Sequence, residues 1–488
     1  MSNYDIIIGL EVHVQLQTAT KLFCGCSTQF GAEPNTQTCP VCTGMPGTLP
    51  VMNRKAFDLA VRTALALNCQ IAPFTKWDRK QYYYPDLPKG YQISQFDLPF
   101  SHDGWLEISD PKGKIEPKRL RIQRVHLEED AGKSMHDEVA GSADSRIDLN
   151  RTGTPLLEIV TQPDMRSPAE AKAFLTELKL LLTYLGVSDC NMQEGSLRVD
   201  GNINLHVHTD AGKIATPIVE VKNMNSFRSV ERALTYEAER LWDVWQESKQ
   251  KLGDVPKQTR GWDDQANITR GQRHKEESSD YRYFPDPDLV PVTVSSERVA
   301  EVQSGLGELP AALRTRLETS YGITPYDSDV IVNQGRAAAD YYLAVADGVA
   351  DGKLASNWFQ QDVLRTLNDR SLTIEQFGVP ATALVALLKK IKGGELDNAR
   401  GRQVFAAMLD QGLSADAAMQ ALGFEQVDES ELVALCQEIV AANPKIVADV
   451  KGGNAKAAGS FVGMAKKKNK NVNPARVQEI CLQLIAQM

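Results

Sequence analysis

Two segments of the sequence alternate acidic or imidazole side chains with apolar ones. In Ile8–Leu16, Glu11 and His13 fall on the face opposite the apolar residues, because side chains of an extended chain point alternately to either face. The segment Leu197–His208 repeats this pattern around Asp200. A single strand of this kind is usually the wet side of an antiparallel sheet. Several strands rich in Glu, Asp, Asn and His fit that reading less well, because like charges on neighbouring strands repel.

A row of carboxylates needs cations to neutralise it. Oxygen ligands joined by one imidazole favour magnesium or manganese, and such ions in a cleft usually hold the phosphates of a nucleotide. Residues two apart on a strand are about 6.8 Å apart, so Glu11 and His13 could serve one metal ion or two. Two further stretches, "VHLEEDAGKS" and "PLLEIV", add acidic residues to strand-like segments. The candidate magnesium and catalytic residues are Glu11, His13, Glu128, Glu129, Glu158 and Asp200.

Four of the eight cysteines form two closely spaced pairs, Cys24-Gly-Cys26 and Cys39-Pro-Val-Cys42. The loop between the pairs contains Gly, Pro and Asn, which suits two ligand-bearing turns that face each other. This spacing predicts a tetrahedral structural zinc site. A pair of redox-active dithiols is the alternative, but the flanking chain lacks a βαβ pattern. The four other cysteines stand alone in apolar surroundings and are expected in cores.

The stretch Leu127–Ser134, "LEEDAGKS", resembles a phosphate-binding loop but lacks its first glycine. Its acidic interior would repel phosphates unless a metal ion lay between them. The sequence also lacks a dinucleotide fingerprint, a nucleophile elbow and a Ser-Ser-Lys amidase cluster.

Basic and aromatic residues are interleaved in "FTKWDRKQYYYPDLPKGYQ" and again in "SSDYRYFPDPDLVP". Such interleaving can bind the ends of nucleic acids by stacking. A packed loop of aromatic anchors and proline turns is the alternative interpretation.

The first part of the chain, to about Pro291, is predicted to be α+β, with short strands and two helices that cover a sheet. One helix begins at the capping sequence Ser167-Pro168-Ala169-Glu170 and ends at Gly186, and the other follows Asn225-Ser226. Beyond Pro291 helical periodicity dominates, so the second part is predicted to be all-helical. The run 451–474, rich in Gly, Ala and Lys, is either a solvated loop or a binding segment.

The chain has 488 residues and a formal charge of −9, which argues against a surface coated uniformly for nucleic acid. Residues 441–488 differ, with eight basic residues against two acidic ones, a local charge of +6. No segment has the length or apolarity of a signal sequence or a membrane span. We therefore expect a cytoplasmic protein with no membrane partner.

Eight blocks of this sequence resemble, in order, those of the B subunit of bacterial aspartyl/glutamyl-tRNA amidotransferase. The similarity runs over essentially the whole chain, and the blocks are "IGLEVHVQL", "CPVCTGMPGTLPVMN", "DRKQYYYPDLPKGYQISQ", "HLEEDAGKS", "NRTGTPLLEIV", "QEGSLRVDGNIN", "VEVKNMNSF" and "DYRYFPDPDLVP".

The resemblance implies a ligase. ATP would phosphorylate the side-chain carboxylate of Glu-tRNA(Gln) or Asp-tRNA(Asn), and ammonia from a partner glutaminase subunit would convert it to Gln-tRNA(Gln) or Asn-tRNA(Asn). The implied cofactors are ATP, Mg²⁺ and structural Zn²⁺. The implied partners are the glutaminase (amidase) subunit, a small linker subunit and the misacylated tRNA, with the non-discriminating aminoacyl-tRNA synthetase as a further candidate.

The implied architecture is a glutamine-synthetase-like, mainly antiparallel cradle with a zinc-binding loop at residues 1–294, a helical domain at 295–404 and a tRNA-binding helical tail at 405–488. The implied nucleotide or acceptor contacts are Glu194, Ser196, Arg198, Asn202 and Lys222. The implied channel or acceptor-end residues are Arg79, Lys80, Tyr82 and Lys89. The implied contacts with the tRNA body are Lys451, Lys456, Lys466, Lys467, Lys468 and Lys470.

One departure from the family pattern is His274, which stands in "TRGQRHKEES" where a hydrophobic residue is expected. Two other functions compete with the one implied by the resemblance. A zinc-containing tRNA adaptor would have purely structural carboxylates. A stand-alone kinase or ligase of the glutamine-synthetase type would work without tRNA, but the basic tail and the missing ammonia source count against it.

Overall fold

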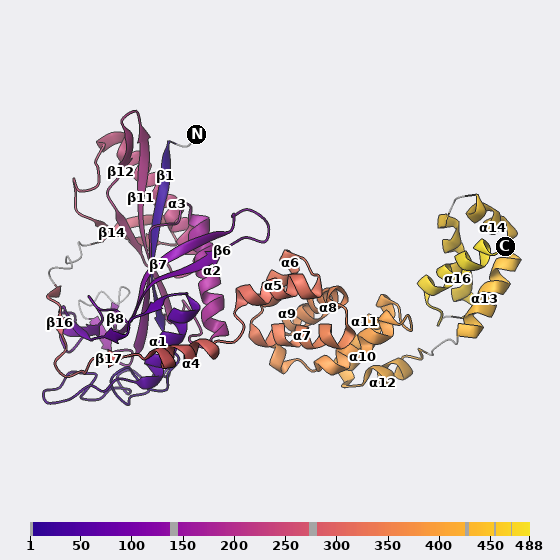
Figure 1. Cartoon of the computed structure of the whole chain (residues 1–488), viewed down its shortest axis with the longest axis horizontal. Helices are drawn as coiled ribbons and strands as arrows, with labels where there is room; N and C mark the ends of the chain where they lie inside the picture. The colour runs from indigo at the N-terminus through magenta and orange to yellow at the C-terminus, as the bar shows by residue number, and fades with distance from the viewer. Residues whose placement is uncertain (1–2, 137–144, 273–280, 425–428, 453–454, 470) are drawn as a thin grey trace. The chain divides into compact units, whose positions relative to one another are not determined.

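The computed structural model describes residues 3–136, 145–272, 281–424, 429–452, 455–469 and 471–488. His274 lies outside these residues, as does Lys470. The chain divides into two compact units, Met1–Pro310 and Ala311–Met488. The first unit is mixed α+β and the second is helical (Figure 1).

A ten-stranded sheet, mostly antiparallel, dominates the first unit. Among its described strand pairs, β13 and β14 alone run parallel. Its order is β15 (Ile268–Gly271), β14 (Gln258–Asp263), β13 (Val219–Lys222), β11 (Leu197–Thr209), β1 (Tyr4–Gln15), β10 (Pro155–Thr161), β7 (Lys118–Glu129), β6 (Ser101–Ile108) and β2 (Gln70–Ile71), with β12 (Gly212–Ala215) paired to β11.

Three smaller sheets flank the large one. They consist of β16 (Phe284–Pro285), β4 (Asp78–Gln81) and β5 (Tyr91–Ser94); β17 (Val292–Thr293) and β3 (Phe74–Thr75); and β8 (Lys133–His136) and β9 (Ser145–Asp148).

Three helices supply most of the apolar partners of the large sheet: α1 (Arg54–Ala66), α2 (Pro168–Tyr184) and α3 (Phe227–Ser248). The two predicted helices are confirmed, and each begins at its predicted cap. Ser167 accepts a hydrogen bond from the Glu170 N–H, and Ser226 accepts one from the Ser229 N–H. The expectation of only two helices before Pro291 was wrong, because it missed α1, which begins at the cap Asn53.

The alternation in β1 separates two environments. Leu10, Val12 and Val14 are buried in the apolar core with α2 and α3, and each such burial contributes about 2 kcal/mol. Glu11 and His13 therefore lie on the opposite face of the sheet. The first unit continues past the predicted boundary at residue 294. Helix α4 (Ser296–Ser304) packs on α1, and Arg298 donates to Asp58 at 2.7 Å.

In the second unit, all regular elements of the described residues are helices. They are α5 (Pro310–Tyr321), α6 (Pro325–Val332), α7 (Arg336–Val349), α8 (Gly352–Trp358), the π-helix η2 (Phe359–Val363), α9 (Leu364–Arg370), η3 (Ile374–Gln376), α10 (Ala381–Lys392), α11 (Asn398–Gln411), α12 (Ala415–Ala421), α13 (Glu429–Ala442), α14 (Pro444–Lys451), η4 (Ala455–Ala458), α15 (Gly459–Lys468) and α16 (Pro474–Ala486). Across the described residues, every helix is too short or too polar to span a bilayer.

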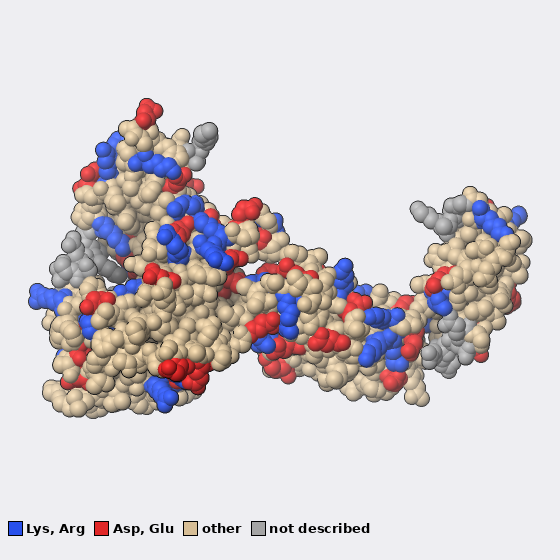
Figure 2. Space-filling model, in the orientation of Figure 1, with Lys and Arg blue, Asp and Glu red and all other residues tan. Residues whose placement is uncertain are grey.

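The loop interpretation of the Gly, Ala and Lys-rich run was wrong for most of its length. Residues 455–468 form η4 and α15, and Phe461 is fully buried among apolar side chains of α13 and α16. On the visible face, Lys and Arg are interspersed with Asp and Glu rather than gathered in one patch (Figure 2).

Candidate functional site

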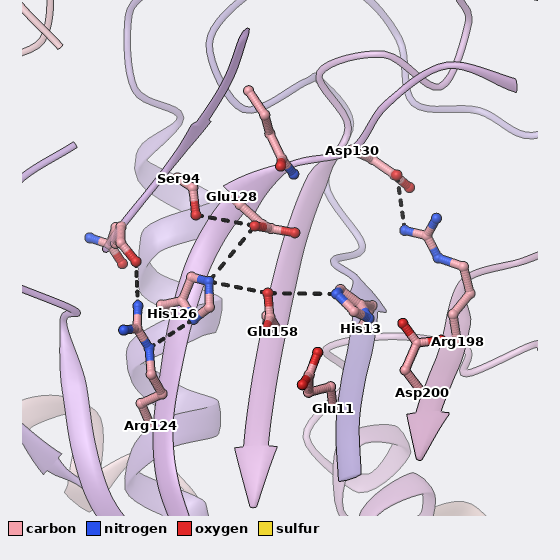
Figure 3. A network of polar contacts seen from close by, with 12 residues as sticks. Glu11, His13, Ser94, Arg124, His126, Glu128, Asp130, Glu158, Arg198 and Asp200 are labelled. Carbon is pink, nitrogen blue, oxygen red and sulfur yellow. Dashed lines mark hydrogen bonds and ion pairs between the residues drawn. The ribbon is translucent and has the colours of Figure 1, made fainter. Parts of the chain in front are cut away.

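A polar row crosses four neighbouring strands on the sheet face opposite the helices. The antiparallel register places Arg198 beside His13, His13 beside Glu158, and Glu158 beside His126. These residues come from β11, β1, β10 and β7, which are remote in sequence. Figure 3 shows the side chains of His126, Glu158 and His13 linked in a line across the sheet, with Arg198 turned toward Asp130. The row exists only because each strand buries its other face and so has a fixed register.

Two groups of possible metal ligands lie along this row. The first group contains His13, Glu128 and Glu158, and the second contains Glu11, Asp200 and Glu220. Within each group the ligand atoms lie within 4.8 Å of one another. Strand β1 contributes one residue to each group, His13 to the first and Glu11 to the second.

His126 holds the first group together. Its Nε2 lies 3.3 Å from Oε2 of Glu158 and 3.7 Å from Oε2 of Glu128. The Nε–H of Arg124 donates to Nδ1 of His126 at 3.2 Å, so Nδ1 carries no proton and Nε2 carries it. The Arg124 guanidinium is itself held by the carbonyl oxygens of Gln95 and Phe96. Nε2 of His126 is thus held facing the two carboxylates.

The electrostatics of the first group keep its carboxylates ionised. Burial would raise the pKa of Glu158, but His126 and His13 lower it well below its ordinary value. Burial would also raise the pKa of Glu128, but the combined effects of His126 and the charge of Lys80 lower it below its ordinary value. For His13, burial lowers the pKa, but the hydrogen bond and charge of Glu158 prevail and raise it.

In the second group an ammonium already neutralises part of the acidic charge. Lys222 forms an ion pair with Asp200, and its Nζ lies 3.4 Å from Oε1 of Glu220. Asn202 donates from Nδ2 to Oε1 of Glu11 at 2.9 Å. Within the described residues, the buried Oδ1 of Asn202 has no hydrogen-bond partner. The side chain of Asn202 thus places an oxygen that could act as a ligand beside Glu11.

Arg198 lies opposite His13 in the strand register and binds Asp130. One guanidinium nitrogen donates to Oδ1 of Asp130 at 2.9 Å, and Arg198 lowers the pKa of that carboxyl despite its burial. Among the residues that the structure describes, the buried Nε–H of Arg198 finds no acceptor. An unpaired buried donor costs about 1–3 kcal/mol unless an incoming anion accepts from it.

Other predicted site residues lie outside both groups. Glu129 points away from Glu128 and pairs with Lys89, because neighbours on a strand face opposite ways. Ser196 donates to Asp189 within a turn, and Glu194 is exposed on the same turn.

The predicted channel residues are built into the first unit in different ways. Arg79 donates to Asp286 at 2.8 Å and to Asp288 at 2.9 Å, which ties β4 to the segment after β16. Lys80 lies 4.9 Å from the ring centre of Tyr281 and 5.9 Å from that of Tyr82. Burial would lower the pKa of Lys80, but the charge of Glu128 raises it. The Lys80 ammonium is thus flanked by two aromatic rings and faces the first group.

The four paired cysteines come together as predicted. One sulfur from each of Cys24, Cys26, Cys39 and Cys42 lies within 4.8 Å of the others. A hydrogen bond from Cys24 lowers the pKa of Cys42 to about 4 against the effect of burial, and the Cys39 backbone and the Lys21 ammonium add to it. Four thiols with a stabilised thiolate fit a tetrahedral metal such as zinc. Cys69, Cys190, Cys436 and Cys481 are buried, as expected for core residues.

Three of the predicted tail lysines are exposed at one helix end. Lys466, Lys467 and Lys468 form the last turn of α15, where Lys468 pairs with Glu438. Lys451 is exposed in the last turn of α14, and Lys456 lies in η4.

His126 and Glu220 are the main residues that sequence reasoning missed. Both had a signal: His126 stands two residues before Glu128, and Glu220 stands two before Lys222, so each shares a strand face with a predicted residue.

Comparison with known proteins places this chain among amidotransferase subunits. Residues 6–300 match the family model described as the GatB/GatE catalytic domain, and residues 340–485 match the GatB domain. The chain therefore belongs to the GatB family, whose amidotransferases are ligases that form carbon–nitrogen bonds.

Curated relatives match along nearly their whole length. The chain is 60% identical over 482 residues to the B subunit of the aspartyl/glutamyl-tRNA(Asn/Gln) amidotransferase of Rhodopirellula baltica, covering 99% of this chain and 97% of the relative. It is 46% identical to the protein of the same name from Moorella thermoacetica, covering 98% of each chain. The same identity holds for the protein of that name from Thermosynechococcus vestitus, covering 96% of this chain and 93% of the relative.

Proposed function

We propose that this amidotransferase subunit uses ATP to phosphorylate the side-chain carboxylate of Glu-tRNA(Gln) or Asp-tRNA(Asn), and then amidates it. The observation that carries the proposal is the pair of acidic groups joined by β1, with His13 in one and Glu11 in the other. Phosphoryl transfer depends on charge neutralisation and positioning more than on covalent chemistry, and this face of the sheet supplies both.

The two groups fit divalent cations. Carboxylates with one imidazole are ligands that Mg²⁺ and Mn²⁺ accept. Oδ1 of Asn202, which has no partner in the part of the chain that the structure describes, adds an oxygen at the second group. We assign His13, Glu128 and Glu158 to one cation and Glu11, Asp200 and Glu220 to another. When bound, such cations neutralise the negative charge of the phosphates.

The residues of the row hold the nucleotide and the acceptor. The Nε–H of Arg198, which has no acceptor among the described residues, would donate to a phosphate oxygen, while Asp130 holds the rest of the guanidinium. Lys80 brings a positive charge toward the first group, where the substrate carboxylate would lie. His126 acts through the two carboxylates that it orients.

The reaction that these groups serve has two displacements. In the first, a carboxylate oxygen of the substrate attacks the γ-phosphorus and ADP leaves. In the second, the nitrogen of ammonia attacks the activated carbonyl carbon, inorganic phosphate leaves, and the nitrogen loses a proton. Glutamine would supply the ammonia through a separate amidase subunit, since no glutaminase nucleophile motif occurs in this sequence.

The remaining assignments complete the proposal. Zinc at the four cysteines would be structural, and the first unit would be a glutamine-synthetase-like cradle, followed by helical and tail domains divided near residue 404. The exposed lysines at the ends of α14 and α15 would contact the tRNA body. A small linker subunit and the non-discriminating aminoacyl-tRNA synthetase are the further partners, and the cytoplasm is where translation needs them.

The decisive experiment uses the assembled complex with ATP, glutamine and Glu-tRNA(Gln) or Asp-tRNA(Asn). We expect Gln-tRNA or Asn-tRNA from the complex and none from this chain alone. The variant Glu158→Gln should lower tRNA-dependent ATP hydrolysis by about 100-fold, whereas Glu194→Gln, the same change on an exposed turn, should leave it unaltered. Unchanged hydrolysis in Glu158→Gln would instead support the tRNA-adaptor function. The same assay shows whether product forms on both tRNAs or on neither.

A further inference from the structure

The turn that carries Cys39 and Cys42 lies directly on the side chain of Lys89. Gly44, two residues after Cys42, has a φ of +73°, and a Cβ at this position would overlap Cγ of Lys89. The same Cβ would lie 3.0 Å from Cα and from Cβ of Lys89. The backbone of the cysteine turn therefore covers the aliphatic stem of this lysine, with no space for a side chain between them.

The covered lysine forms a buried ion pair. Nζ of Lys89 binds Oε1 of Glu129, and the two side chains are only 5% and 1% exposed. The backbone N–H of Ile93 donates to the same oxygen at 2.9 Å, and the ring of Tyr91 lies 5.2 Å from Nζ. A buried ion pair is costly to break, because either partner alone leaves an uncompensated charge.

A second glycine, Gly153, lies between the cysteine cluster and Glu129, the other member of this ion pair. Gly153 has a φ of +83°, and a Cβ there would lie 3.5 Å from Cβ of Cys42 and 3.7 Å from Oε2 of Glu129. Lys21, fully buried, closes the arrangement: its Nζ donates to the Gln37 carbonyl at 2.7 Å and lies 3.6 Å from Sγ of Cys42.

We propose that a metal ion at the four cysteines acts as a clamp that holds Lys89 on Glu129. Ligation fixes the turn from Cys39 to Gly44, and this turn leaves the lysine no other position. The cysteine site is then a positioning element for the end of β7, where Glu129 adjoins Glu128. Keeping Lys89 and Glu129 paired prevents either charge from disturbing the acidic group that contains Glu128. This inference stands independently of the proposed reaction.

The test measures how fast an amine-specific acylating reagent modifies Lys89 in the full-length chain, by mass spectrometry of peptides. The zinc-loaded chain should protect Lys89, and removal of zinc by a chelator should raise its modification rate about tenfold or more through local opening. Lys118, which pairs with Glu170 at the opposite end of β7, serves as the internal reference and should not change.

A matched pair of variants separates the clamp from general unfolding. Gly44→Ala should expose Lys89 about as much as zinc removal does while the cysteines still hold zinc, because the new Cβ displaces the lysine. Gly47→Ala places the same residue at a φ of +84° with no atom within 4 Å, and should keep Lys89 protected. Equal modification of Lys89 with and without zinc would overturn the proposal. Equal exposure of Lys89 in the two variants would also overturn it. The same holds if zinc removal raises the modification rate of Lys118 while Gly44→Ala has no effect on Lys89.

Discussion

Glu128 and Glu129 are neighbours at the end of β7 and serve two different clusters. Glu128 lies 3.7 Å from His126 and belongs to the acidic group with Glu158 and His13. Glu129 points through the other face of the strand, where Lys89 and the cysteine turn meet it. Two identical side chains, one residue apart, therefore have separable functions.

Replacing each of these glutamates by glutamine should give opposite phenotypes. Glu128→Gln removes a negative ligand and should weaken Mn²⁺ or Mg²⁺ binding about tenfold or more, with little loss of stability. Glu129→Gln leaves the Lys89 ammonium buried without a carboxylate and should lower the free energy of unfolding by about 3 kcal/mol, with metal affinity preserved. Calorimetric metal titration and denaturant unfolding measure the two effects. Identical behaviour of the two variants would contradict the separation.

Metal binding at the first acidic group should strengthen as the pH rises. Glu158 raises the pKa of His13, and an imidazole must lose its proton before it can bind a cation, so protons compete at low pH. The protonated form contributes stability to the metal-free chain below its unfolded pKa, and this contribution is lost as the pH rises through the folded pKa.

The measurement is Mn²⁺ affinity between pH 5.5 and pH 8.5, a range chosen to span the ordinary pKa of histidine at about 6.5. His13→Asn retains an oxygen ligand that does not titrate, so its affinity should vary much less over the same range. A wild-type affinity that is independent of pH would refute the role of His13 as a ligand.

Arg198→Lys should weaken ATP binding while keeping the ion pair with Asp130. The lysine retains the positive charge but lacks the Nε–H that has no partner among the described residues. We expect the KM for ATP to rise about tenfold with a smaller change in kcat. Arg121→Lys is the control, since Arg121 is an exposed residue that binds Asp164 on the surface. An equal effect of both variants would point to a general loss of stability.

Substituting Lys466, Lys467 and Lys468 together by glutamine should weaken tRNA binding in a salt-dependent way. If each lysine neutralises one phosphate, the slope of log affinity against log salt should decrease in magnitude by about 2–3. Filter binding of the assembled complex at several salt concentrations measures this slope. An unchanged slope would place the tRNA contacts elsewhere, and a matched triple substitution of Lys389, Lys390 and Lys392 tests whether position matters.

Period-two alternation was enough to predict most of the acidic face. It placed Glu11 and His13 together opposite the core, and Asp200 and Asn202 on a second strand, because each strand has one buried face. Applied consistently, the same rule would have separated Glu129 from Glu128 and included His126. Glu128 and Glu129 were grouped because the acidic run was expected to follow a strand-like segment, whereas β7 extends through Glu129.

Other features depend on contacts that no local pattern encodes. The close approach of Gly44 to Lys89 joins segments 45 residues apart, and that of Gly153 to Cys42 joins segments 111 residues apart. Helix α1 was missed because it follows the cysteine loop without the strong leucine stripe that marks α2. Lys222 was assigned to nucleotide contacts, yet its ammonium lies among the carboxylates of the second group.

Strand β1 fixes the distance between the two acidic groups, because it contributes one residue to each. Because it lies between β10 and β11 and its other face is fully buried, the spacing from Glu11 to His13 is set by the repeat of an extended chain. The two acidic groups therefore keep a constant separation when a ligand binds. Flexible side chains such as that of Lys222 make any adjustment to the ligand. An insertion of one residue between Glu11 and His13 would turn one of these two side chains toward the core.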